Sequence, residues 1–239
     1  MAVKKLASSL ELRPHFHNSI KFKERRFKFT AKQKRFLSVL LDPENKILFV
    51  SGPAGSSKTY MSLYGCLRLM ADEADRELLY VRSIAESADR GLGSLPGDIS
   101  EKFNPFLMPL YDKLDEIVFE GDKDFLRRQG RISAVPINFM RGASWNNKLV
   151  IADEAQNFTF KELTTLVTRI GEGSKLVICG DFMQSDINGK SGFEEMFKLF
   201  KDEESKENGI VSFSFNQNDI VRSKILKFII SKLESHKQV

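Results

Sequence analysis

The feature that most constrains the fold is a short apolar run that leads directly into a turn rich in glycine and serine. The run is Ile47–Val50, and the turn is Ser51-Gly52-Pro53-Ala54-Gly55-Ser56-Ser57-Lys58-Thr59. Proteins hold phosphate groups with a buried strand, such a turn and a helix that begins near the lysine, because the turn directs backbone N–H groups at the anion. The helix adds its positive N-terminal end to the same place. The sequence therefore predicts a phosphate-binding loop.

Each polar residue of this loop has an expected role. Lys58 would reach the β- and γ-phosphate oxygens, and the Thr59 hydroxyl would ligate Mg²⁺. Ser57 stands where the usual pattern has glycine, which leaves the conformation of the loop open. An ordinary strand–turn–helix connection is the alternative. The candidate nucleotide contacts are Gly52, Pro53, Ala54, Gly55, Ser56, Ser57, Lys58, Thr59 and Tyr60.

Two carboxylates follow a second apolar run, Leu149–Ala152, and they predict the metal-binding half of the same site. With a phosphate loop upstream, Asp153 would hold Mg²⁺ directly or through a water. Glu154 would orient and deprotonate an attacking water. A water-activating carboxylate argues against a small-molecule kinase, whose nucleophile is a substrate hydroxyl. The alternative is a strand followed by an acidic helix cap.

A third apolar run, Leu176–Cys179, ends in Gly180-Asp181-Phe182-Met183-Gln184. Ligands of a parallel sheet bind at the carboxyl ends of its strands. Asp181 and Gln184 are therefore expected on the rim beside the γ-phosphate, where they could sense its presence. Many strands end in Gly-Asp turns, so the weight of this segment comes from being the third strand end that points to one place.

Continuously apolar runs, which also include Leu78–Val81, are typical of parallel strands that are buried on both faces. Helix-like segments alternate with them at Tyr60–Ala71, Lys161–Arg169 and Phe193–Phe200. This alternation predicts an α/β fold, a parallel sheet with helices on both faces. Val211–Phe215 alternates with a period of two instead, which is typical of an edge strand covered on one face.

A helix is also predicted at the end of the chain, after Asn218 and Asp219, which are plausible caps. Its apolar residues form one stripe. They are Val221, Ile225, Phe228, Ile229 and Leu233.

The 239 residues are interpreted as a leader, residues 1–28, and a single domain, residues 29–239, with an insertion around residues 83–147. The insertion contains an amphipathic region near Phe106–Val118 and a charged segment around Gly121–Arg131. Residues 1–30 hold eight Lys or Arg against two Glu, a net charge of +6, whereas the whole chain carries +5. This basic leader is either a solvated, disordered tail or a contact for nucleic-acid phosphates.

The composition indicates a cytoplasmic protein without a membrane partner. No apolar stretch approaches the roughly 18 residues of a membrane span. The N-terminus lacks the apolar core of a secretory signal. Cys66 and Cys179 lie inside apolar segments without the spacing of metal ligands, so we interpret them as reduced core residues.

Taken together, these motifs resemble those of the PhoH family of ATPases, which is related to the RecA-like core of superfamily-1 helicases. The resemblance extends from about Phe29 to Leu233, and its Leu-Pro-Gly-Asp and Met-Arg-Gly sequences are not general ATPase features. It rests on Gly52-Pro53-Ala54-Gly55, Ser94-Leu95-Pro96-Gly97-Asp98, Met140-Arg141-Gly142, Asp153-Glu154-Ala155-Gln156-Asn157, Gly180-Asp181 with Gln184, and Asp219-Ile220-Val221-Arg222. It implies a P-loop NTPase fold of the RecA-like type that binds ATP and Mg²⁺.

The resemblance also implies roles for residues outside the strand ends. Gln33 is similar to the glutamine that reads the adenine edge in related helicases, and its amide can donate and accept at once. Arg222 is similar to a late arginine of the family and would contact the γ-phosphate, in trans if subunits form a ring. Arg82 and Arg141 match motif arginines. Each arginine could instead be a surface residue or part of a structural ion pair.

The resulting hypothesis is a Mg²⁺-dependent ATPase that remodels RNA or single-stranded DNA in the manner of a helicase. With one RecA-like core per chain, completing the site calls for a neighbouring subunit, so the resemblance implies a homo-oligomeric ring such as the hexamers of some relatives. The short chain suggests a minimal bacterial or phage form. A P-loop kinase of a small molecule and an ATP-gated nucleic-acid-binding module with little turnover remain alternatives.

Overall fold

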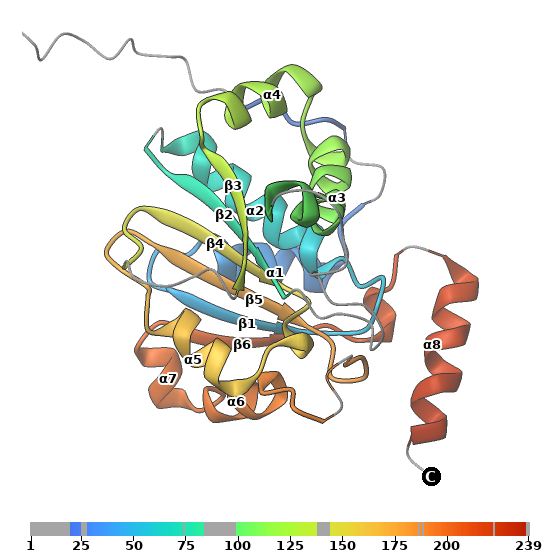
Figure 1. Cartoon of the computed structure of the whole chain (residues 1–239). Helices are drawn as coiled ribbons and strands as arrows, with labels where there is room; N and C mark the ends of the chain where they lie inside the picture. The colour runs from blue at the N-terminus through green and yellow to red at the C-terminus, as the bar shows by residue number, and fades with distance from the viewer. Residues whose placement is uncertain are drawn as a thin grey trace, which may run out of the picture.

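The centre of the molecule is one sheet of six parallel strands (Figure 1). The structure is a computed structural model, and it describes residues 20–24, 28–73, 75–83, 99–137, 144–185, 187, 189–221 and 223–237. The strand order is β3-β2-β4-β5-β1-β6. The strands are β1 (Ile47–Ser51), β2 (Glu77–Arg82), β3 (Ile132–Pro136), β4 (Lys148–Asp153), β5 (Lys175–Gly180) and β6 (Ile210–Ser214).

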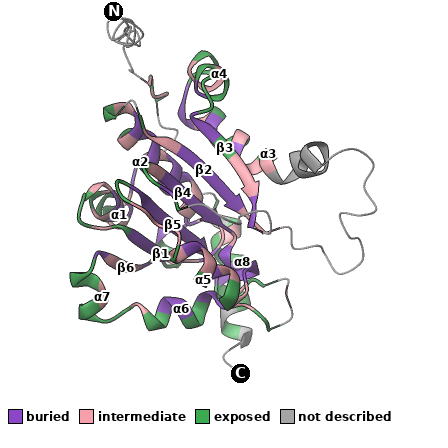
Figure 2. Cartoon of the chain, turned by 60° about the vertical axis from the view of Figure 1, so that its left-hand side comes forward, coloured by how far each residue is buried: buried purple, intermediate pink, exposed green. Residues whose placement is uncertain are grey.

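Helices cover both faces of this sheet, as the sequence predicts. Alternate residues of the central strands enter two separate apolar clusters, one beneath α1 to α4 and the other beneath α5 and α6. Figure 2 shows the buried strands between the partly exposed helices. The helices are α1 (Ala31–Leu41), α2 (Lys58–Asp72), α3 (Ile99–Ile117), α4 (Glu120–Arg128), α5 (Phe160–Val167), α6 (Phe193–Leu199), α7 (Glu203–Glu207) and α8 (Lys224–Lys237), with 3₁₀ turns η3 (Ala155–Asn157) and η4 (Gln217–Asp219).

The two edge strands differ in how well the sequence predicts them. β6 lies at an edge, as its period of two predicts. β3 was not predicted, and it forms the opposite edge by pairing with β2 in parallel. Its residue Ser133 is exposed and Pro136 cannot donate to a ladder, so it lacks the apolar continuity of the buried strands. β3 lies within the expected insertion, residues 83–147, and is one strand of the sheet.

Part of the basic leader packs against the α3–α4 region. Phe22 forms an antiparallel bridge with Val118, and the backbone N–H of Lys23 donates to the carbonyl of Ile117 at 2.8 Å. The Lys23 ammonium donates to the carbonyl of Asp115 at 2.7 Å. Residues 22 and 23 of the leader are therefore held against the end of α3.

Helix α8 differs from its prediction in both its cap and its environment. Asn218 and Asp219 belong to η4, and Ser223 caps α8 by accepting the N–H of Leu226 at 3.1 Å. An apolar stripe on a helix normally faces a core. Figure 1 shows α8 standing apart from the sheet, and four stripe residues within it are 44–65% exposed: Ile225, Phe228, Ile229 and Leu233. No helix in the described part of the chain has the length and apolar content to cross a bilayer.

Candidate nucleotide site

The phosphate loop connects β1 to α2 and depends on two left-handed residues. Gly55 has φ +79° and Ser57 has φ +67°. The left-handed conformation costs a non-glycine residue about 1–2 kcal/mol, so Ser57 adopts the backbone of the usual glycine at a moderate cost. Gly52 is required by packing, because a Cβ there would lie 2.7 Å from the Cβ of Phe215.

The polar side chains of the loop bond to its own carbonyl groups. The Lys58 ammonium donates to the carbonyls of Gly52 at 2.5 Å and Pro53 at 3.1 Å. The buried Ser56 hydroxyl donates to the same Pro53 carbonyl at 2.8 Å. Lys58 therefore lies folded over the loop, where a phosphate group would offer it stronger, anionic acceptors.

Thr59 and Asp153 meet although they come from different strand ends. The Thr59 hydroxyl donates to Oδ1 of Asp153 at 2.8 Å. The other carboxylate oxygen, Oδ2, accepts from the Tyr80 hydroxyl at 2.6 Å. Burial and the neighbouring Asp153 charge raise the pKa of Tyr80, which keeps its hydroxyl protonated as a donor. A hydroxyl and a carboxylate oxygen are hard ligands that suit Mg²⁺, which binds few protein groups and completes its shell with phosphate and water.

Glu154 follows Asp153 in a left-handed backbone conformation, with φ +54°. Its carboxylate accepts from the Gln156 amide at 2.6 Å and lies 3.8 Å from the Arg82 guanidinium. Burial raises the pKa of Glu154, and the charge of Asp153 raises it further, whereas Gln156, Arg82 and Lys58 lower it. A carboxylate with a raised pKa is suited to take a proton from water.

Gln156 links the end of β4 to the end of β5. Its side-chain oxygen accepts the N–H of Asp181 at 3.0 Å, while its nitrogen holds Glu154. Its backbone carbonyl accepts the Ser185 hydroxyl at 3.2 Å. Asp181 is buried, and its carbonyl accepts the N–H of the exposed Gln184 at 3.3 Å. The rim segment, residues 181–185, is thus held beside Glu154 by hydrogen bonds to Gln156.

The strand order explains why these groups meet. β5 lies between β1 and β4, so the phosphate loop, the rim segment and the two carboxylates follow three adjacent strands. In a parallel sheet these carboxyl ends lie at one edge. Among the described residues no cluster of three or more His, Cys, Asp or Glu side chains could hold a metal ion.

Gln33 lies at the start of α1 and is fully buried. Its side-chain oxygen accepts the N–H of Thr30 at 3.0 Å as part of a capping box, and its side-chain nitrogen is buried without a partner. The amide nitrogen is thus a donor without a partner, and the amide oxygen, which has two lone pairs, already accepts one hydrogen bond.

The remaining predicted residues surround the loop or fall outside the described residues. The Tyr60 ring is 5% exposed and packs 6.5 Å from the ring of Phe29. The N–H of Val221 donates to the carbonyl of Gly55 at 3.3 Å, so the chain passes the loop one residue before Arg222. The predicted residues outside the described part of the chain are Arg222, Arg141 and the Ser94–Asp98 segment.

Sequence reasoning assigned no role to Tyr80 and none to Gln156. Tyr80 is the one hydroxyl-bearing residue in the apolar run Leu78–Val81, which was the available signal. Gln156 was part of a motif without a function attached. Both become visible as site residues once β2, β4 and β5 are known to be adjacent.

The fold is also found in a solved structure. The large terminase of a thermophilic bacteriophage, solved in complex with ADP, matches 85% of this chain and 50% of its own length, with a TM-score of 0.52 and 13% identity. At that identity the match concerns the fold alone, which is that of a P-loop NTPase.

Sequence comparisons give the family. Residues 27–234 match the family model described as PhoH-like protein. The PhoH-like protein of Synechocystis sp. is 35% identical over 208 residues, covering 86% of this chain and 61% of the relative. Protein PhoH of Escherichia coli strain K12 is 32% identical over 200 residues, covering 82% of this chain and 55% of the relative. The chain thus spans less than two thirds of these relatives, and over that length it belongs to the PhoH family.

Proposed function

We propose that the chain is a Mg²⁺-dependent ATPase that acts on RNA or single-stranded DNA. The observation that carries this proposal is the 2.8 Å hydrogen bond between Thr59 and Asp153. It joins the phosphate loop to the carboxylate strand, and Lys58 and Glu154 are the sequence neighbours of the two bonded residues. Membership of the PhoH family and the P-loop fold support the nucleotide part of the proposal.

Each side chain has a task in hydrolysis. Lys58 would leave the loop carbonyls and bond to the terminal phosphates, and Thr59 with Asp153 would hold Mg²⁺. The metal, when bound, supplies positive charge that neutralises the phosphate oxygens. Glu154 would align a water with the γ-phosphorus and accept its proton. Asp181 and Gln184 would lie on the rim beside the γ-phosphate, where they could sense its presence.

Further residues would complete the site. The unpartnered nitrogen of Gln33 would donate to the base, since a buried donor without an acceptor costs about 1–3 kcal/mol. Arg222 would stabilise charge at the γ-phosphate, in trans if subunits form a homo-oligomeric ring. Sedimentation gives the oligomeric state, and an ATPase assay gives the rate. A monomer with the full ATPase rate would refute the proposal that Arg222 acts in trans.

The decisive test of hydrolysis is Glu154→Gln. This variant should bind ATP with the wild-type affinity and hydrolyse it at a strongly reduced rate, because the amide cannot take a proton. An unchanged rate would remove Glu154 from the mechanism. Labelled ATP distinguishes the alternatives, since a kinase would transfer the γ-phosphate to an acceptor other than water.

The nucleic-acid part rests on the charge of the leader, +6 over residues 1–30. ATP hydrolysis should be titrated against defined RNA and DNA oligomers, and stimulation by one of them would identify the substrate class. A nucleotide-gated binding module would show binding without stimulation. Removing residues 1–19 keeps the packed Lys21 and Lys23 and tests the rest of the leader. An unchanged affinity and salt slope would exclude that segment as the contact.

A further inference from the structure

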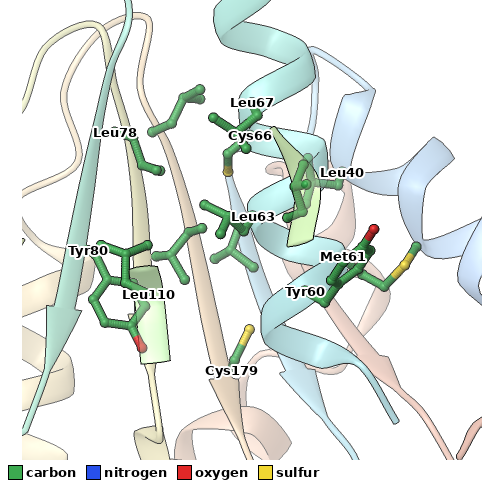
Figure 3. Packing of buried hydrophobic residues seen from close by; sticks show 14 of the residues in the cluster. Leu40, Tyr60, Met61, Leu63, Cys66, Leu67, Leu78, Tyr80, Leu110 and Cys179 are labelled. Carbon is green, nitrogen blue, oxygen red and sulfur yellow. The ribbon is translucent and has the colours of Figure 1, made fainter. Parts of the chain in front are cut away.

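One buried hydroxyl at the site has no part in the reaction described above. Tyr80 lies on β2 and is fully buried on the face of the sheet that packs against α2. Figure 3 shows its ring among the apolar residues of this cluster, with the hydroxyl directed toward the carboxyl ends of the strands. β2 pairs with β4 so that Arg82 lies opposite Asp153. Tyr80, two residues earlier on β2, can therefore reach the Asp153 carboxylate.

The two oxygens of Asp153 have different partners. Oδ2 accepts from Tyr80 at 2.6 Å, and Oδ1 accepts from Thr59 at 2.8 Å. Asp153 is only 4% exposed, so little water can replace either donor. Turning the carboxylate away would leave the Tyr80 hydroxyl buried without an acceptor, which costs about 1–3 kcal/mol. The orientation of the carboxylate is therefore fixed from the side opposite the loop.

We propose that Tyr80 is a positioning residue for the metal ion: by holding Oδ2, it keeps Oδ1 of Asp153 beside the Thr59 hydroxyl, where both oxygens face Mg²⁺. This inference rests on the proposed function, because it concerns the same metal. If Thr59 and Asp153 held the ion, the Thr59 hydroxyl would no longer donate to Oδ1, and the hydrogen bond from Tyr80 would still orient the carboxylate. Mg²⁺ demands nearly ideal octahedral geometry, so the direction of this oxygen matters more than it would for Ca²⁺.

The test is Tyr80→Phe, which keeps the ring and removes only the hydroxyl. Mn²⁺ binding in the presence of ADP, followed by electron paramagnetic resonance, gives the metal affinity, and competition with Mg²⁺ gives that of the native ion. Because loss of such an outer partner typically costs 10–100-fold in metal affinity, we expect about tenfold weaker binding. The affinity for ADP in EDTA should stay unchanged.

The matched control is Tyr64→Phe on α2, where the ring packs against Phe22 and Phe29. It should leave both affinities unchanged. Wild-type metal affinity in Tyr80→Phe would overturn the inference, and so would equal weakening of metal-bound and metal-free ADP, which indicates a purely structural role. If wild-type protein binds ADP no better with metal than in EDTA, the proposed function itself fails, which is a distinguishable result.

Discussion

Replacing Gln156 with leucine should move the acid side of the pH–rate profile for ATP hydrolysis to higher pH. Glu154 must be deprotonated to take a proton from water, so the rate falls as the pH drops through its pKa. Burial already raises this pKa, and the 2.6 Å hydrogen bond from Gln156 is among the interactions that lower it. Leucine removes that bond, so the pKa rises further.

The size of the shift follows from the bond that is lost. A hydrogen bond to a charged group contributes about 1.5–3 kcal/mol, and one pKa unit corresponds to about 1.36 kcal/mol. The Glu154 side chain is 41% exposed, so water replaces part of the lost hydrogen bond. We expect the acid midpoint to rise by less than about one pH unit. At a pH well above the midpoint, the hydrolysis rate of Gln156→Leu should be close to the wild-type rate.

The assay is steady-state hydrolysis at saturating ATP and Mg²⁺ across the pH range, with the exposed Gln129→Leu at the end of α4 as the matched control. Gln129→Leu should keep the wild-type profile. A rate in Gln156→Leu that is lowered equally at every pH would refute the reasoning, because it would show that Gln156 acts on the fold and not on the ionisation of Glu154.

Three stability predictions follow from packing and backbone conformation. Gly180→Ala should lower the free energy of unfolding by about 1–3 kcal/mol, since its Cβ would lie 2.5 Å from the fully buried Phe193 ring; a urea midpoint equal to wild type contradicts this. Ser57→Gly should raise the free energy of unfolding by about 0–1.6 kcal/mol, because the added freedom of the unfolded chain offsets only part of the relieved left-handed strain. Ser57→Val should be clearly destabilising in the same assay, and equal midpoints for the two variants would argue against the left-handed loop. Phe228→Ser should change the free energy of unfolding by less than about 1 kcal/mol, because its side chain is 58% exposed. A larger loss of free energy would show that this face of α8 is covered.

The sequence predicts those elements whose burial shows in a short local run of residues. A strand buried on both faces must be apolar throughout, so β1, β2, β4 and β5 are visible as continuous runs. The carboxylates at the end of β4 are visible for the same reason, because they end such a run. β3 is not, because an edge strand tolerates exposed and polar residues such as Ser133.

Contacts between strands are beyond this local signal. The bond from Tyr80 to Asp153 joins residues 73 positions apart and exists only because β2 lies beside β4. Likewise, the bond from Gln156 to Asp181 requires β4 and β5 to be neighbours. Apolar runs carry no information on strand order. The exposed face of α8 is a similar case, because an apolar stripe predicts a buried side but does not say what covers it.

The two bonds that Lys58 makes to the loop carbonyls have a consequence for which anions the loop prefers. A phosphate that binds to Lys58 must replace the carbonyl groups of Gly52 and Pro53 as hydrogen-bond acceptors. The free energy gained is the difference between the bond of Lys58 to a charged acceptor and its bond to a neutral carbonyl. It grows with the charge of the anion that binds. A singly charged anion such as chloride gains little free energy from this exchange, whereas a polyphosphate gains much more. The bonds of Lys58 to the loop carbonyls thus favour anions of higher charge, independently of any contact with the nucleoside.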